Sequence, residues 1–301
     1  MSLPLPALIA LLAGALLSAP TRADIVLTDD AGRSVRLARP AQRIVSLAPH
    51  VTELLFAAGA GKQVVGVVAH SDHPPAATTL PQVGTHTRVD LEAVALLKPD
   101  LVVAWKSGNR DTHLERFTAL GIPVYVNEPR SLEAVAQSLE QFGRLAGTED
   151  AARSAAAAFR QRQARLAARY RDRPPVRVFY QIWNQPLMTI NDEQVISDAI
   201  RLCGGINVFG GLNQLAPRIG TEAVLAANPE AIVASGMADA RPEWLDQWKR
   251  WPGLQAAASG NLFFIPPELI QRHTPRLLDG AERLCAQLEE VRARRPPPVS
   301  R

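Results

Sequence analysis

The sequence has little cysteine, few aromatic residues and almost no imbalance of charge. Two cysteines in 301 residues exclude a small scaffold held together by many disulfides, and 47% hydrophobic residues exclude a disordered chain. With 33 Lys and Arg against 29 Asp and Glu, the net charge of +4 gives no reason to expect a nucleic-acid partner. A globular protein remains, and its length predicts two domains.

Nucleotide-binding and catalytic motifs are also missing. The stretch Gly59-Ala60-Gly61-Lys62 approaches a phosphate-binding loop, but Phe56 replaces the first glycine and Gln63 replaces the Ser or Thr after the lysine. The sequence has no G-x-G-x-x-G after its first expected strand, no G-x-S-x-G and no H-E-x-x-H. We therefore expect a binding protein with no cofactor of its own; an exported α/β enzyme, which would turn its ligand over, is the alternative.

The chain begins with a nearly unbroken apolar run from Leu5 to Ala19. The run is shorter than the ~20 residues that span a bilayer, and Thr21-Arg22-Ala23 approximates the small-x-small site of an export signal. We expect residues 1–23 to be a cleaved signal peptide and the mature protein to be exported; the resemblance described below implies that it resides in the periplasm. Because no Lys or Arg precedes the run, a buried core helix or an uncleaved anchor is the alternative.

The rest of the chain alternates strand and helix patterns, which predicts two Rossmann-like α/β lobes with mainly parallel sheets. The first lobe covers 24–146 and the second 174–292; residues 293–301, with three consecutive prolines, are expected to form a disordered tail. The expected strands are 43–47, 64–68, 101–104, 124–126, 176–181, 231–235 and 262–265. The expected helices are 52–58, 91–97, 113–120, 131–145, 194–202, 221–227 and 275–292, with a loop at Pro49-His50.

The linker region 147–173 joins the two lobes. From Glu149 to Arg171 it has no proline or glycine and is rich in Ala, Arg, Gln and Leu, so it predicts one helix of about 22 residues, or ~33 Å. Pro174-Pro175 ends this helix. A single stiff linker favours lobes that move little against each other, because bending would break its hydrogen bonds.

A repeat with an offset of 130 relates the two lobes. Glu92-Ala93-Val94 precedes the segment 98–104, and Glu222-Ala223-Val224 precedes the similar segment 228–234 at the same spacing. Glu92 and Glu222 therefore occupy equivalent helix starts, where a carboxylate is favoured by the helix dipole. Each is either an ordinary N-terminal helix residue or one of two matched carboxylates that meet a partner with two-fold symmetry.

Polar, aromatic and imidazole side chains follow the ends of the expected strands, where open α/β sheets bind ligands. Trp105 is the leading candidate for ligand contact, because an indole at a loop tip packs on flat groups; capping its own lobe is the alternative. Trp244, Trp248 and Trp251 are better explained by ordinary packing. The candidate ligand-binding residues are Pro49, His50, His70, His86, Trp105, Trp183, Ala216, Glu268, Leu269, Ile270, Gln271 and Arg272.

Four histidines of the first lobe raise the question of a metal: His50, His70, His73 and His86. They lie on separate loops without a histidine-rich tract, so we expect no zinc site and no metal held by the protein alone. A single imidazole, His70 or His86, could still act as an axial ligand of a metal inside a macrocycle.

Cys203 and Cys285 are 82 positions apart, too far for a C-x-x-C motif, and form either a disulfide or two buried free thiols.

Several segments resemble the periplasmic cobalamin-binding receptors of vitamin importers, in the class that also serves haem and iron–siderophore uptake. The resemblance covers essentially the whole mature chain. It is clearest at 43–49, 71–75, 96–109 and 203–209, and the Ala104-Trp105 pair followed by a basic residue and Gly108-Asn109 is closest to the cobalamin branch.

This resemblance implies a receptor that binds cobalamin or a related corrinoid between its lobes and is a monomer when free. It implies contact of the ligand with Trp105 and with 268–272, and a Cys203–Cys285 disulfide. It also implies that Glu92 and Glu222 meet arginines of a membrane permease dimer that carries the ATPase subunits of an ABC importer. A haem receptor of the same class is the main alternative, followed by an iron–siderophore receptor.

Four positions depart from the pattern of that family. His70 and His86 stand where aromatic wall residues are expected, Ala216 stands where an aromatic precedes Pro217, and Trp183 lies one place beyond its expected position. These changes preserve the receptor role and alter the lining, which is compatible with a related corrinoid or haem.

Overall fold

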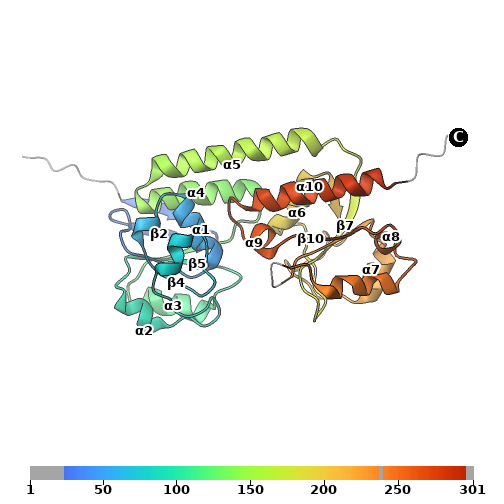
Figure 1. Cartoon of the computed structure of the whole chain (residues 1–301). Helices are drawn as coiled ribbons and strands as arrows, with labels where there is room; N and C mark the ends of the chain where they lie inside the picture. Colours follow the sequence, from blue (N-terminus) through green and yellow to red (C-terminus); the bar gives the residue numbers. More distant parts are fainter. Residues whose placement is uncertain (1–23, 237–239, 296–301) are drawn as a thin grey trace, which may run out of the picture.

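The computed structural model describes residues 24–236 and 240–295, so the expected signal peptide at 1–23 lies outside the described residues. Two α/β lobes lie side by side, as the sequence predicts (Figure 1). The expected tail lies outside the described residues from position 296 onward, and Ala293 is the last residue of a helix. No helix within the described ranges is both long and apolar enough to cross a membrane.

Each lobe contains a four-stranded parallel sheet, and the two sheets have the same strand order relative to the chain. The order is β4-β3-β5-β6 in the N-terminal lobe and β8-β7-β9-β10 in the C-terminal lobe. Their bounds are β3 (Ile44–Ser46), β4 (Val64–Val67), β5 (Leu101–Trp105), β6 (Val124–Asn127), β7 (Val176–Gln181), β8 (Gly205–Asn207), β9 (Ala231–Ala234) and β10 (Leu262–Phe264). A two-stranded antiparallel hairpin, β1 (Ile25–Thr28) and β2 (Ser34–Leu37), precedes the first sheet.

Helices cover both sheets because their apolar faces need burial. Those of the N-terminal lobe are α1 (Pro49–Ala57), α2 (Leu91–Leu96), α3 (Asp111–Ala119) and α4 (Leu132–Ala146). Those of the C-terminal lobe are α6 (Val195–Leu202), α7 (Thr221–Ala227), α8 (Gln255–Ala258), α9 (Pro267–Ile270) and α10 (Leu277–Ala293), and the linker is α5 (Glu149–Tyr170). Short 3-10 helices are η1 (Gly61–Gln63), η2 (Pro75–Thr79) and η3 (Glu243–Arg250).

The internal repeat extends to the backbone conformation. Lys98 and Asn228, 130 positions apart, both have positive φ angles, 46° and 40°, and each is followed by a proline. Two residues further on, the carboxylates of Asp100 and Glu230 each accept a backbone N–H from the beginning of the first parallel strand of their own lobe, at 2.8 and 3.0 Å. The two lobes are thus built from the same βαβ unit.

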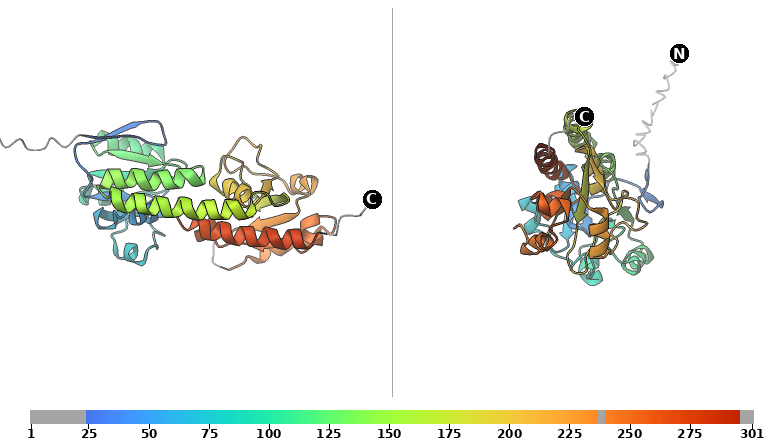
Figure 2. Two further views of the ribbon diagram at one scale, coloured as in Figure 1. Left: turned by 90° about the horizontal axis from the view of Figure 1, so that it is seen from above. Right: turned by 90° about the vertical axis from the view of Figure 1, so that its right-hand side faces the viewer.

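The linker helix α5 packs along α4 in the N-terminal lobe and reaches α10 in the C-terminal lobe (Figure 2). Gly143 of α4 lies against Ala152 of α5 so closely that a Cβ at position 143 would collide with the alanine side chain. Near the middle of α5, Arg160 binds the carboxylates of Glu133 and Glu140 on α4. These contacts fix the direction in which α5 leaves the first lobe.

Helix α10 is fastened to two neighbours. The expected Cys203–Cys285 disulfide is confirmed, and it joins the end of α6 to the middle of α10. Arg162 of α5 pairs with Asp279 and Glu282 of α10 at 2.6 and 2.8 Å. Closing a loop of 82 residues restricts the unfolded chain, which stabilises the fold by about 4 kcal/mol in the chain-entropy account.

One expectation about the backbone was wrong. Pro49 and His50 do not form a loop but are the first residues of α1. Proline fits the first helical position because its missing N–H would have no partner there, and its ring fixes a helical φ angle. The sequence reading also missed β8, which has only three residues, and the 3-10 helix η3.

Candidate functional site

Several of the candidate side chains gather where the carboxyl ends of the N-terminal strands meet the C-terminal lobe. Trp105 is the last residue of β5, and His50 lies in the first turn of the helix that follows β3. The ring centroids of His50 and Trp105 are 5.2 Å apart at 83°, and those of His86 and Trp105 are 5.8 Å apart at 47°. We call these three residues, together with His273 described below, the junction cluster.

The loop after β5 holds Trp105 in place. The Trp105 backbone N–H donates to Asn109 Oδ1 at 2.6 Å, while the Asn109 amide donates to the carbonyls of Leu47 and His86 at 3.0 and 2.7 Å. Asn109 thereby joins the end of β3, the His86 loop and the tryptophan. The Trp105 ring folds onto Gly108, where any Cβ would overlap it, so Gly108 and Asn109 both serve to set the orientation of the indole.

The C-terminal lobe contributes His273, whose ring centroid lies 5.4 Å from that of His50. Both histidines are buried, and His273 Nε2 lies 3.3 Å from the amide nitrogen of Gln194. Within the described chain, no hydrogen-bond partner is found for His50 Nε2, His273 Nδ1 or Trp105 Nε1. Buried polar atoms are normally paired, so three unpaired ring nitrogens in one place distinguish this junction from an ordinary core.

Burial decides the charge of the two histidines. It lowers the pKa of His273 to about 4, and it lowers the pKa of His50 well below its usual value, with further contributions from His273, Arg272 and His86. Burial also lowers the pKa of His86, assisted by His70. The imidazoles of the junction cluster are therefore neutral near pH 7.

Two arginines of the C-terminal lobe cross to the N-terminal lobe beside this cluster. Arg276 makes a bidentate pair with Glu53 of α1, with both N–O distances at 2.7 Å, and the Glu53 side chain is only 4% exposed. Arg272 pairs with Asp72 at 2.5 Å and also donates to the His70 carbonyl at 3.3 Å. His70 itself has a φ of 67°, a conformation that costs energy for a non-glycine residue and is often found at functional sites.

The other expected ligand residues are distributed around the C-terminal lobe. Trp183 is 39% exposed, and its Nε1 donates to the Gln185 carbonyl at 2.9 Å. Ala216 is exposed on the loop that pairs with the segment around Met188. The remaining C-terminal candidates lie in and after α9: Glu268 with one buried oxygen that has no partner in the described chain, Leu269 and Gln271 half-buried, and Ile270 in the core.

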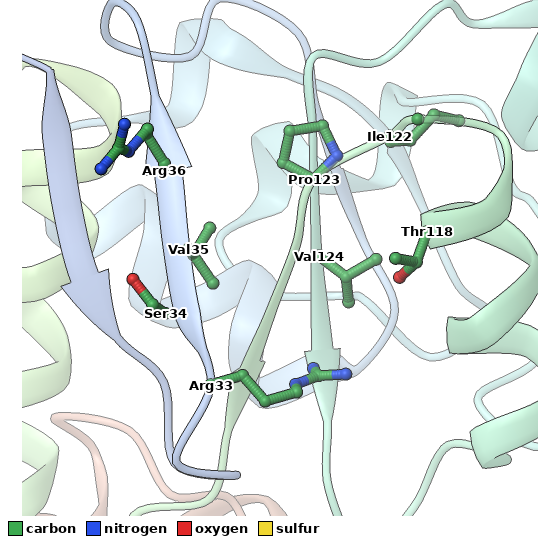
Figure 3. A pocket seen from close by; sticks show the side chains of 9 residues that line it. Arg33, Ser34, Val35, Arg36, Thr118, Ile122, Pro123 and Val124 are labelled. Carbon is green, nitrogen blue, oxygen red and sulfur yellow. The ribbon is translucent and has the colours of Figure 1, made fainter.

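Across residues 24–236 and 240–295, no group of three or more His, Cys, Asp or Glu side chains is placed to hold a metal ion. A pocket of about 300 Å³ lies elsewhere, between β2 and the loop that leads into β6 (Figure 3). Its walls include Arg33, Arg36 and Val124, and it contains none of the expected ligand residues. The junction cluster is therefore the candidate site.

Glu92 and Glu222 are both exposed, in the first turns of α2 and α7. Both helices lie on the side of the molecule opposite α5 (Figure 1). The repeat thus places the two helices that begin near these glutamates on the same side of the molecule.

The sequence reading missed three residues of the junction: Glu53, His273 and Arg276. A signal existed for Glu53, because it is the only acid in a largely apolar helix and would be costly to bury without a cationic partner. Nothing in the sequence near Glu53 identifies that partner, since Arg276 lies 223 positions away.

Comparison with known proteins places this geometry in a family. The sequence profile of the family described as "Periplasmic binding protein" matches residues 44–269. The chain is 34% identical over 251 residues to the vitamin B12-binding protein of Vibrio cholerae. The matched region covers 83% of this chain and 90% of that protein. The corresponding protein of Vibrio parahaemolyticus is 33% identical over 256 residues, covering 85% and 92%.

Solved structures agree with this assignment. The crystal structure of the periplasmic vitamin B12-binding protein of Vibrio cholerae matches with a TM-score of 0.77 at 34% identity, covering 84% of this chain and 98% of that one. A periplasmic heme-binding protein from Pseudomonas aeruginosa matches with a TM-score of 0.69 at 27% identity, covering 82% and 92%.

The buried neutral His273 predicts that the fold loses stability in mild acid. Its pKa is near 6.5 when unfolded and about 4 when folded, so the unfolded chain binds the proton first as the pH falls below 6.5. Between pH 7 and pH 5 this group alone should cost about 2 kcal/mol of unfolding free energy. Urea unfolding at pH 7 and pH 5 measures the free energy of unfolding that is lost between the two pH values. In His273→Gln this loss should be smaller by about that amount than in the original protein. Equal losses in the two proteins would contradict the lowered pKa of His273.

Proposed function

The chain belongs to the periplasmic binding protein family, and we propose that it captures cobalamin or a related corrinoid at the junction of its lobes for an ATP-driven importer. The observation that carries the proposal is the junction cluster, in which an indole and three imidazoles from both lobes come together. The relatives in the two Vibrio species are named for binding vitamin B12.

The chemistry of the junction suits such a ligand. A corrinoid offers a large flat macrocycle, which packs on an indole face, and peripheral amides, which both donate and accept hydrogen bonds. Trp105 provides the aromatic surface, and the ring nitrogens of Trp105, His50 and His273, which are buried and have no partner in the described chain, would meet amide groups after a shift of these side chains. Arg272 and Glu268, on the segment after β10, supply further polar contacts from the C-terminal lobe.

His70 and His86 replace aromatic side chains expected in the family, and they allow a contact with the metal of the ligand. His86 lies beside Trp105, and His70 is close enough to His86 to lower the pKa of His86. Either ring could therefore ligate the metal at the centre of the macrocycle. Haem is the second candidate ligand for the same reason, and the matched structure from Pseudomonas aeruginosa is named for binding heme.

Delivery is the second half of the proposal. The receptor would act in the periplasm after removal of residues 1–23, as a monomer. Glu92 and Glu222 would each meet a cationic patch on one subunit of a permease dimer that carries two ATPase subunits. Their placement on one side of the two repeated lobes supports a partner with two-fold symmetry.

Calorimetry with the mature protein tests the ligand. Cyanocobalamin or cobinamide should bind, and Trp105→Ala should weaken binding at least about tenfold because a large buried aromatic contact is lost. Trp251→Ala, an exposed tryptophan of the other lobe, is the matched control and should bind normally. Absence of binding to both corrinoids would refute the assignment. Haemin binding with a Soret band that changes in His70→Ala or His86→Ala would favour haem.

If Glu92 and Glu222 serve delivery alone, changing them should affect the importer and leave corrinoid binding intact. Glu92→Lys combined with Glu222→Lys should abolish stimulation of the importer's ATPase, because two attractive charges become repulsive, while corrinoid affinity stays unchanged. Asp150→Lys with Asp172→Lys, a pair of exposed carboxylates at the two ends of α5, controls for the change in net charge. A loss of corrinoid affinity in the Glu92 and Glu222 variant would show instead that these carboxylates serve the ligand.

A further inference from the structure

A small aromatic pocket lies directly beside Glu222. It has a volume of about 270 Å³, and its wall includes Thr221, the residue before Glu222 and the first residue of α7. The Glu222 carboxylate folds back toward this helix start, since a Cβ at Gly220 would lie 2.7 Å from Glu222 Oε2. Thr221 thus connects the wall of the pocket to Glu222, the next residue along α7.

Three tryptophans from one short segment line the pocket, and they have different roles. Trp248 is buried, donates from Nε1 to Gln181 Oε1 at 2.8 Å and packs edge-on against Phe179. Trp244 is half-buried, and Trp251 is 44% exposed. Trp248 is accounted for by the core, whereas Trp251 keeps part of its ring exposed at the edge of the pocket. Tryptophan is among the residues most enriched at the binding hot spots of protein interfaces.

The size and lining of the pocket indicate what it accepts. Small-molecule sites usually measure ~300–1,000 Å³, so a volume of about 270 Å³ suits a single inserted side chain better than a ligand such as a corrinoid. The indoles and Leu187 form apolar walls. Arg250 at the rim disfavours a cation inside the pocket, so a cationic group of the same partner would lie outside it, at Glu222.

We propose that this pocket is an anchor point for the importer's membrane subunit, taking one apolar side chain from a segment whose neighbouring cation meets Glu222. The inference rests on the delivery role proposed above and adds an asymmetry to it. In the N-terminal lobe the corresponding segment, α3, has no tryptophan. The C-terminal lobe would therefore hold its permease subunit more tightly than the N-terminal lobe holds the other.

Surface plasmon resonance with the importer's permease–ATPase complex in nanodiscs tests the pocket. Trp251→Ala should weaken the affinity of the receptor for the complex by about tenfold or more, as for other aromatic anchors. Gln247→Phe, which introduces a bulky ring at the exposed edge of the pocket, should weaken it without removing any native apolar contact. Ile206→Ala, at a 49% exposed apolar residue of the same lobe, is the control and should leave the affinity unchanged.

The double lysine variant at Glu92 and Glu222 separates the two proposals. If it abolishes binding while Trp251→Ala and Gln247→Phe bind like the original protein, the pocket is not an anchor and the carboxylate docking stands. If none of these variants alters binding, both proposals are wrong. Calorimetry with cyanocobalamin supplies a further check, because weaker corrinoid binding by Trp251→Ala would assign the pocket to the ligand site and overturn the inference.

Discussion

The bidentate pair between Glu53 and Arg276 is the interaction on which the arrangement of the two lobes depends. Glu53 is almost fully buried in α1, and Arg276 immediately precedes α10 in the other lobe. Removing Arg276 would leave the Glu53 carboxylate buried without its partner, which typically costs about 3–5 kcal/mol. The pair therefore holds the start of α10 against the N-terminal lobe.

Other contacts connect α10 to its surroundings. The disulfide fastens its middle to α6 within the C-terminal lobe, so that α10 moves with this lobe. Arg162 fastens it to the linker helix α5, which is itself packed along α4 of the N-terminal lobe. A motion of one lobe would have to disturb several of these contacts together. The junction cluster lies next to the ion pair, so Trp105, His50 and His273 are already in place before any ligand arrives. Such preorganisation reduces the entropy lost on binding and favours affinity.

Local patterns in the sequence were sufficient to predict the two lobes, the linker helix, the 130-residue repeat and the place of Trp105 at the end of a strand. Each of these depends on neighbouring residues: an uninterrupted run of helix formers, a repeated Pro with an acidic residue, or an indole at a strand end. The contacts between lobes could not be predicted in this way. Arg276 is 223 positions from Glu53, and His273 meets His50 only after both lobes have folded.

His50 shows a second reason for the difference. The sequence reading placed it on an open loop as a ligand contact, whereas the structure places it in a helix, buried against Trp105 and His273. The residue type and its position after a strand were informative, but burial is decided by the opposite lobe. The same limit applies to the tryptophans of η3, where the sequence favoured packing and only the structure distinguishes Trp248 from the exposed Trp251.

The rigid junction is tested most directly by the distance between spin labels at Leu120 and Ile206, two exposed residues on different lobes. Pulsed electron paramagnetic resonance would measure that distance with and without saturating cyanocobalamin. If the Glu53–Arg276 pair and the contacts of α10 hold the junction rigid, the label-to-label distances should form one narrow distribution. Its mean should shift by less than about 2 Å when cyanocobalamin binds. A broad distribution in the free protein that collapses on binding, or a shift of many ångströms, would contradict the account.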